Sequence, residues 1–331
     1  MILDRRVAID NVCAWPNLTV LRDGVIIATI FSQPTHGGWE GDVACWASAD
    51  GAKTWRYRGT PASHEPGTNR MNVAAGLSAS GDLLVLASGW TPRPAVGSPP
   101  ADHSQAHTLA PWICRSADGG CTWQVRDDFP RPNGPSSQYI PFGKIVIADN
   151  GDLVASVYAG ASAEPRHSAF VTRSTDDGRT WQPPTLLADD DYNETDLLHL
   201  GRGRWLAVSR TRRDQHLQLL RSDDDAHTWR TVMPLTSPMQ IPGHLLQLAG
   251  GRLLLCHGNR CSGEFGVNAR LSDDDGRSWS ASLRLAETTD LDCGYPASVQ
   301  LPDQAILTAY YAKCSAVHDR YHMATVTWQP P

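Results

Sequence analysis

One eight-residue motif occurs five times in this chain, and its repetition constrains the fold more than any other feature. Each copy has a Ser, an Asp two positions later, a Thr or Ser six positions later and a final Trp, at residues 48–55, 116–123, 174–181, 222–229 and 272–279. An Asp in such a tight turn accepts hydrogen bonds from nearby backbone N–H groups and tolerates left-handed geometry. Five copies at spacings typical of a structural repeat indicate that each copy marks one unit of a repeat architecture.

A second repeated element lies between these motifs, and it consists of two short apolar segments around a polar turn. Six copies begin at Trp15, Met71, Tyr139, Glu194, Ile241 and Gly294. Each copy predicts a β-hairpin, and a second hairpin that carries the motif completes the unit. The sequence therefore predicts an all-β fold, a six-bladed β-propeller with four antiparallel strands per blade, formed by residues 1–331 as a single domain. Residues 5–10 are expected to add a strand to the last unit and close the ring.

The composition excludes several classes of partner. The net charge is −6 and there is no run of Lys or Arg, so neither nucleic acid nor an anionic membrane is an expected partner. No apolar stretch is long enough for a membrane span. The N-terminus has no apolar signal segment, which predicts a cytoplasmic protein, although a secreted chain without its signal would look the same. The eight cysteines show no metal-ligand spacing, and no metal or cofactor is predicted.

The repeated motif resembles the Asp box of the sialidase (neuraminidase) superfamily, in which the box forms the outer hairpin turn of a propeller blade. This resemblance implies the architecture more than an activity, because lectin-like propellers also carry the box. Four further positions are similar to the sialidase site in type and order. They are Glu194 after an Asn at a strand start, Arg210 and Arg260 at two strand ends, and Tyr295 after a Gly.

The resemblance implies that Tyr295 is a nucleophile and that Glu194 is its base partner. Tyr is a poor nucleophile because its reference pKa is about 10, so a Glu within hydrogen-bond reach has to take its proton. Sialidases with a Tyr nucleophile depart in this way from the two-carboxylate scheme of other glycosidases. Arg210 and Arg260 are then expected to bind one carboxylate of the sugar.

The first unit departs from the sialidase pattern at the position where an Arg is expected. Trp15 stands there between Ala and Pro, so the clamp of three arginines is incomplete, and Arg70 at the start of the second unit is expected to replace it. Alignment of the hairpins also places Trp15 and Asn72 at the mouth of the central pocket. We therefore expect Arg70, Asn72 and Trp15 to bind substrate.

The proton donor is expected in the Gly-rich segment 35–42, about a dozen residues before the first box. His36 is the first candidate because imidazole donates a proton near neutral pH, and Asp42 is the second. Glu40 lies between them and is expected to contribute to substrate binding.

Together these residues predict an exo-acting glycoside hydrolase that acts on an acidic or otherwise unusual terminal sugar, with carbohydrate as the only expected partner. One alternative is a polysaccharide lyase, in which Tyr295 or His36 abstracts the proton beside a uronate carboxylate. The other alternative is a glycan-binding propeller without catalysis.

Overall fold

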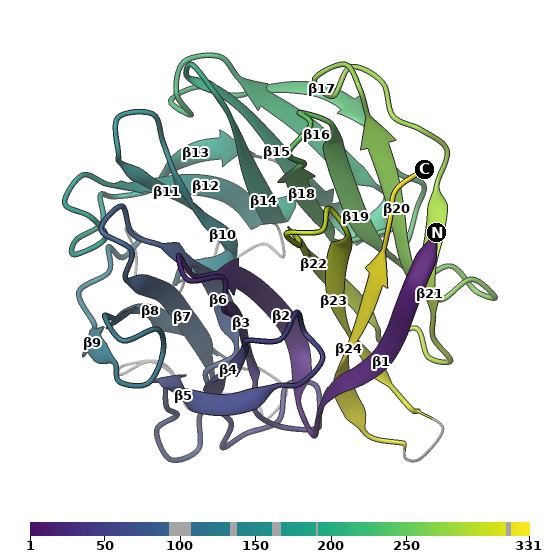
Figure 1. Cartoon of the computed structure of the whole chain (residues 1–331). Helices are drawn as coiled ribbons and strands as arrows, with labels where there is room; N and C mark the ends of the chain where they lie inside the picture. Colours follow the sequence, from purple (N-terminus) through teal and green to yellow (C-terminus); the bar gives the residue numbers. More distant parts are fainter. Residues whose placement is uncertain (93–106, 133–137, 161–166, 190, 316–318) are drawn as a thin grey trace.

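The computed structural model describes residues 1–92, 107–132, 138–160, 167–189, 191–315 and 319–331. In these residues the chain forms 24 β-strands and one short 3-10 helix, Arg212–Asp214. The sheets surround a central region, and the first strand of most units lies next to the centre (Figure 1). The chain is therefore all-β, as the period-two hairpins predict.

Four sheets have four strands each. The first contains β2 (Cys13–Val20), β3 (Ile26–Phe31), β4 (Val43–Ser48) and β5 (Arg56–Ala62). The second contains β14 (Tyr192–Gly201), β15 (Arg204–Thr211), β16 (Leu217–Ser222) and β17 (Arg230–Pro234). The third contains β18 (Gly243–Gln247), β19 (Leu253–Asn259), β20 (Gly266–Ser272) and β21 (Leu283–Glu287). The fourth contains β22 (Gly294–Gln300), β23 (Ile306–Lys313), β24 (Tyr321–Trp328) and β1 (Ile2–Asp10).

The remaining eight strands form one continuous sheet. Half of it contains β6 (Asn72–Leu77), β7 (Leu83–Thr91), β8 (His107–Ser116) and β9 (Gln124–Arg126). The other half contains β10 (Ile140–Ile147), β11 (Leu153–Gly160), β12 (His167–Ser174) and β13 (Thr185–Ala188). The prediction of a six-bladed propeller is therefore wrong, since only four four-stranded sheets stand as separate blades among the described residues.

The two halves join because small residues let two inner strands approach closely. Strand β10 pairs in parallel with β6, with Gly143 opposite Ala74 and Lys144 opposite Ala75. A Cβ on Gly76 would lie 2.3 Å from the carbonyl oxygen of Ile145, so only glycine fits there.

The N-terminal strand closes the last sheet. Strand β1 pairs antiparallel with β24 from Ile2 opposite Trp328 to Asp10 opposite His322. This confirms the expected strand at residues 5–10, and it places both termini side by side (Figure 1). Hydrophobic clusters fill the space between adjacent sheets; in one of them Val154 of β11 packs in the same cluster as Trp205 of β15, which is fully buried.

The five boxes form the outer turns as the motif predicts. In the first box, Asp50 accepts hydrogen bonds from the Ser48 hydroxyl at 2.9 Å and from the Thr54 amide and hydroxyl at 2.9 and 2.6 Å. The same contacts recur in the fourth box, where the hydrogen bond from the Thr228 hydroxyl is the main cause that lowers the pKa of Asp224 to about 2.

The five box tryptophans are buried to different degrees. Only Trp181 is buried, and the other four are half-buried: Trp55, Trp123, Trp229 and Trp279. The indole N–H of Trp123 donates to the carbonyl of Gly120 at 3.0 Å, so this ring folds back over its own turn. Trp181 is more deeply covered because Phe129 packs on it with ring centroids 6.4 Å apart.

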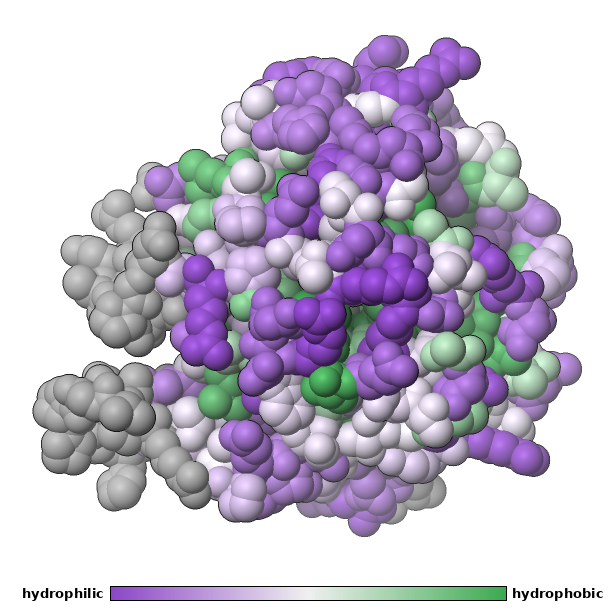
Figure 2. Space-filling view, turned by 90° about the vertical axis from the view of Figure 1, so that its left-hand side faces the viewer, coloured by the Kyte–Doolittle hydropathy of each residue, from purple (hydrophilic) through white to green (hydrophobic). Residues whose placement is uncertain are grey.

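The face of the molecule that carries β9 and β13 is mostly hydrophilic (Figure 2). Hydrophobic residues form small separate groups on this face. Exposed Tyr57, Val125 and Leu186 lie on three outermost strands. Scattered residues of this kind are normal on soluble proteins. No helix in the described part of the chain is long and apolar enough to cross a membrane.

Candidate active site

Tyr295, Glu194 and Arg210 form one buried hydrogen-bonded group. The Tyr295 hydroxyl donates to Glu194 Oε1 at 2.5 Å, and Arg210 Nη1 donates to Glu194 Oε2 at 2.7 Å and to the Tyr295 oxygen at 3.0 Å. The three residues come from β22, β14 and the end of β15. The structure thus brings together three residues that the sequence analysis had matched to the sialidase site only by their type and their order along the chain.

Irregular pairing aims these side chains at the centre. Register shifts interrupt the pairing of three inner strands, between Cys13 and Asn17, Tyr192 and Thr195, and Gly294 and Ala297. Trp15, Glu194 and Tyr295 lie inside these interruptions. Bulges of this type redirect side chains and occur often beside active sites.

The backbone at the candidate nucleophile is unusual. Gly294 has φ +102° and Tyr295 has φ +50°. A left-handed conformation costs about 1–2 kcal/mol for a residue with a Cβ. The surrounding sheet therefore holds Tyr295 in a position that its own backbone preference opposes.

The electrostatics keep Tyr295 protonated at rest. Burial and then the negative charge of Glu194 raise the pKa of the Tyr295 hydroxyl well above its usual value, and Arg210 and Arg260 oppose this only in part. Burial disfavours the charge of Arg210, but Glu194, Tyr295 and Asp214 together raise its pKa. A Tyr in this state needs a base to become a nucleophile, and Glu194 is in contact with its proton.

Arg260 covers the other side of Tyr295. Its guanidinium carbon lies 5.4 Å from the centre of the Tyr295 ring, within cation–π range. Its Nε and Nη2 donate to the carbonyl of Cys293 at 3.2 and 3.1 Å, and Nη2 also donates to the Tyr311 hydroxyl at 3.1 Å. Arg210 and Arg260 therefore both adjoin the same tyrosine.

His36 contacts a carboxylate that sequence reasoning missed. Its Nδ1 lies 2.9 Å from Asp292 Oδ2, and the hydroxyls of Tyr311 and Tyr321 donate to the two oxygens of Asp292. Although burial opposes it, these three hydrogen bonds hold the pKa of Asp292 well below its usual range. One signal was available, because Asp292 lies three residues before Tyr295 in the same segment.

Glu40 and Asp42 contact a different histidine. His64 Nε2 lies 2.8 Å from Glu40 Oε2, and His64 Nδ1 lies 2.7 Å from Asp42 Oδ1. The hydrogen bond to Asp42 is the main cause that raises the pKa of His64. The structure thus separates His36 from the two acidic residues of its loop, and no contact joins either of these to Tyr295 among the described residues. Sequence reasoning also missed His64.

Two further predicted binding residues, Arg70 and Asn72, contact aromatic side chains elsewhere. Arg70 lies with its guanidinium carbon 3.7 Å from the centre of the Trp112 ring and donates to the carbonyl of Ala110 at 2.8 Å. Burial lowers the pKa of Arg70 to about 10. Asn72 accepts a hydrogen bond from the indole of Trp90 at 2.9 Å. No contact in the described part of the chain joins Arg70 to Arg210 or Arg260.

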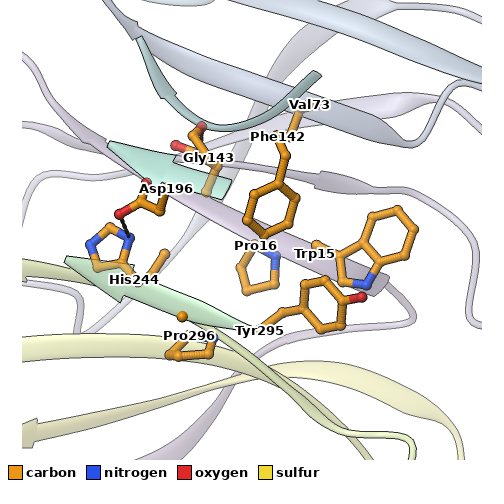
Figure 3. Close-up of a pocket in the computed structure, with 12 residues that line it drawn as sticks. Trp15, Pro16, Val73, Phe142, Gly143, Asp196, His244, Tyr295 and Pro296 are labelled. Carbon is orange, nitrogen blue, oxygen red and sulfur yellow. Dashed lines mark hydrogen bonds and ion pairs between the residues drawn. The ribbon is translucent and has the colours of Figure 1, made fainter. Parts of the chain in front are cut away.

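Trp15 lies between the two candidate catalytic groups. Its ring centre is 5.1 Å from that of Tyr295 and 5.6 Å from that of His36. Figure 3 shows Trp15, Phe142 and Tyr295 along one side of a small central cavity, with Asp196 and His244 on the other side. The cavity has a volume of about 30 Å³. Within the described residues, no three His, Cys, Asp or Glu side chains are grouped so that they could hold a metal ion.

Comparisons with known proteins agree with this architecture. A family model for the BNR repeat-like domain matches residues 24–308. No curated protein matches the chain. The chain is similar in structure to a protein of unknown function from Dyadobacter fermentans, with 22% identity and a TM-score of 0.84 over 100% of this chain and 99% of that one.

Two structures with functional names are also similar. A Hadza microbial sialidase has 18% identity and a TM-score of 0.73, and the match covers 98% of this chain and 65% of the sialidase. The α-L-arabinanase of Penicillium chrysogenum has 13% identity and a TM-score of 0.64 over 98% of both chains. At these identities the likeness shows the fold.

Proposed function

The chain belongs to the BNR repeat-like domain family. We propose that it is an exo-acting glycoside hydrolase of the sialidase superfamily, with Tyr295 as its nucleophile. The observation that carries the proposal is the 2.5 Å hydrogen bond from the Tyr295 hydroxyl to Glu194. A tyrosine hydroxyl in contact with a buried carboxylate can lose its proton to that carboxylate while it attacks.

The proposed reaction has two steps. In the first, the Tyr295 oxygen forms a bond to the anomeric carbon, Glu194 takes the hydroxyl proton, and the bond to the leaving oxygen breaks as His36 protonates that oxygen. In the second step, water attacks the same carbon and gives a proton to His36, while Tyr295 leaves and recovers its proton from Glu194. The configuration at the anomeric carbon is retained because each step inverts it.

The proposed substrate is a glycan that ends in an acidic or otherwise unusual sugar. Two arginines at Tyr295 support an acidic group, since guanidinium groups bind carboxylates in a forked geometry. Trp15 occupies the position where the sialidase resemblance places another Arg, which favours a sugar other than ordinary sialic acid.

A substrate panel with variants tests this function. The purified protein is incubated with aryl glycosides and oligosaccharides that end in different acidic and neutral sugars, and the products are identified by NMR. Tyr295→Phe is compared with Tyr310→Phe, because Tyr310 is buried in the same sheet but packs in a cluster away from the site. We expect turnover to be lost only in Tyr295→Phe. Near-normal turnover in that variant contradicts covalent catalysis by this tyrosine.

The same panel separates the two alternatives. An unsaturated product that absorbs ultraviolet light identifies a lyase. Binding of an oligosaccharide without any turnover identifies a glycan-binding propeller.

A further inference from the structure

The structure joins His36 to the candidate site through a chain of polar groups from three sheets. Arg260, at the end of β19, donates to the Tyr311 hydroxyl of β23, which donates to Asp292 before β22. His36 lies between β3 and β4 and completes the chain at Asp292. The loop of the first sheet is thus tied to the last sheet next to Tyr295.

Asp292 is held in one ionisation state and one orientation. Its two oxygens accept hydrogen bonds from Tyr311 and Tyr321, and both oxygens lie within 3.0 Å of His36 Nδ1. Three donors on one carboxylate stabilise the ionised form. The backbone next to this carboxylate is also held, because the Asp292 amide donates to Asp290 Oδ1 at 2.8 Å.

An ionised carboxylate can only accept hydrogen bonds, and this fixes the state of the histidine ring. Nδ1 of His36 must carry a hydrogen to donate to Asp292. Nε2 then remains as the nitrogen that exchanges a proton with other groups. The side chain of His36 is 36% exposed, so the ring is open to a ligand while its Nδ1 is engaged.

We propose that Asp292 is a positioning residue that fixes His36 as the proton donor of the reaction, with Tyr311 and Tyr321 as the groups that hold Asp292. This proposal rests on the proposed function. It explains how a histidine on a loop can act as the proton donor. Its orientation comes from another sheet, and Glu40 and Asp42 of its own loop are bound to His64.

The test compares Asp292→Asn with wild type on two kinds of substrate. An Asn side chain can donate to Nδ1 and favour the wrong tautomer, and a wrong tautomer disables a catalytic histidine. For substrates with poor leaving groups we expect a loss of about 100-fold in kcat/KM, the lower range for a general acid. For activated aryl glycosides, whose leaving group needs no protonation, we expect a nearly unchanged kcat/KM, because this constant does not include the second step, in which His36 takes a proton from water. Asp303→Asn, in a hairpin turn of the same sheet, is the matched control.

Tyr321→Phe provides a milder change. It removes one donor from Asp292 and leaves His36 and Asp292 in place, so we expect a smaller loss with the same dependence on the leaving group. Equal losses for both kinds of substrate in Asp292→Asn overturn the proposal, because they indicate a structural role. Unchanged turnover on both kinds also overturns it.

A spectroscopic readout separates this proposal from the proposed function. Nitrogen NMR of the His36 ring reports which ring nitrogen carries the hydrogen, whether or not the protein has glycosidase activity. We expect the Nδ1–H form in wild type and its loss in Asp292→Asn. A wild-type ring with hydrogen on Nε2 alone overturns the positioning role, whereas the Nδ1–H form in a protein without glycosidase activity overturns only the proposed function.

Discussion

The hydroxyl of Tyr295 lies 2.5 Å from Glu194 Oε1 although the two residues are 101 positions apart in the chain. Both residues sit at irregular strand starts in different sheets, and both are buried. Arg210 bonds to both of them. Burying an acid, a phenol and a guanidinium together is costly unless they pair, so this group depends on all of its hydrogen bonds.

Replacement of Arg210 by Met should destabilise the fold strongly. Glu194 would stay buried without its cationic partner, and loss of one member of a buried ion pair costs about 3–5 kcal/mol. Urea unfolding measures the free energy of unfolding directly. Arg277→Met is the control, because Arg277 is exposed in the fifth box, and surface substitutions of this kind change stability little. A loss of under about 1 kcal/mol for Arg210→Met, the value of a surface pair, contradicts the prediction.

The box aspartates should make stability depend on acid pH. The folded-state pKa of Asp224 is about 2, below the unfolded value of about 3.9, so the native state binds fewer protons between these values. Its contribution is present above about pH 4 and is lost as the pH falls towards 2. The difference in Tm between wild type and Asp224→Asn should therefore shrink from about pH 5 to about pH 2. A constant difference over this range contradicts the assignment.

The box tryptophans should differ in their contributions to stability. Truncation of buried Trp181 to Ala should cost about 3–5 kcal/mol, the usual range for a buried aromatic residue. Trp229 is half-buried, so Trp229→Ala should cost less. Chemical unfolding of the two variants compares them under the same conditions. Equal losses of unfolding free energy in the two variants would mean that the packing of Phe129 on Trp181 adds nothing to stability.

Local features of the fold were predictable from the sequence. The box turns follow from the Ser, Asp and Thr spacing, because the contacts at Asp50 lie within seven residues. The added strand at the N-terminus was also predictable, since the last unit lacks a box hairpin. The number of separate blades was not predictable, because it depends on how closely Gly76 lets β10 approach β6. Hairpin patterns carry no information on such distances between units.

The candidate site likewise contains residues that could be predicted from the sequence and contacts that could not. Tyr295, Glu194, Arg210 and Arg260 could be found by their order along a repeat, and the structure brings all four together. The hydrogen-bond partners of the loop 35–42 in the first unit could not be found in this way. Whether Asp42 faces His36 or His64 depends on the conformation of loops that come from different hairpins, and residue spacing does not determine it.

Covalent catalysis can be tested by identifying the residue that bonds to the sugar. A fluorinated sugar of the class that the panel identifies slows release of the intermediate, and digestion followed by mass spectrometry locates the attached mass. We expect one added sugar on Tyr295 in wild type, and no added sugar in Tyr295→Phe. Attachment to another residue, or turnover of the natural substrate with inversion and no attached sugar, would contradict this expectation.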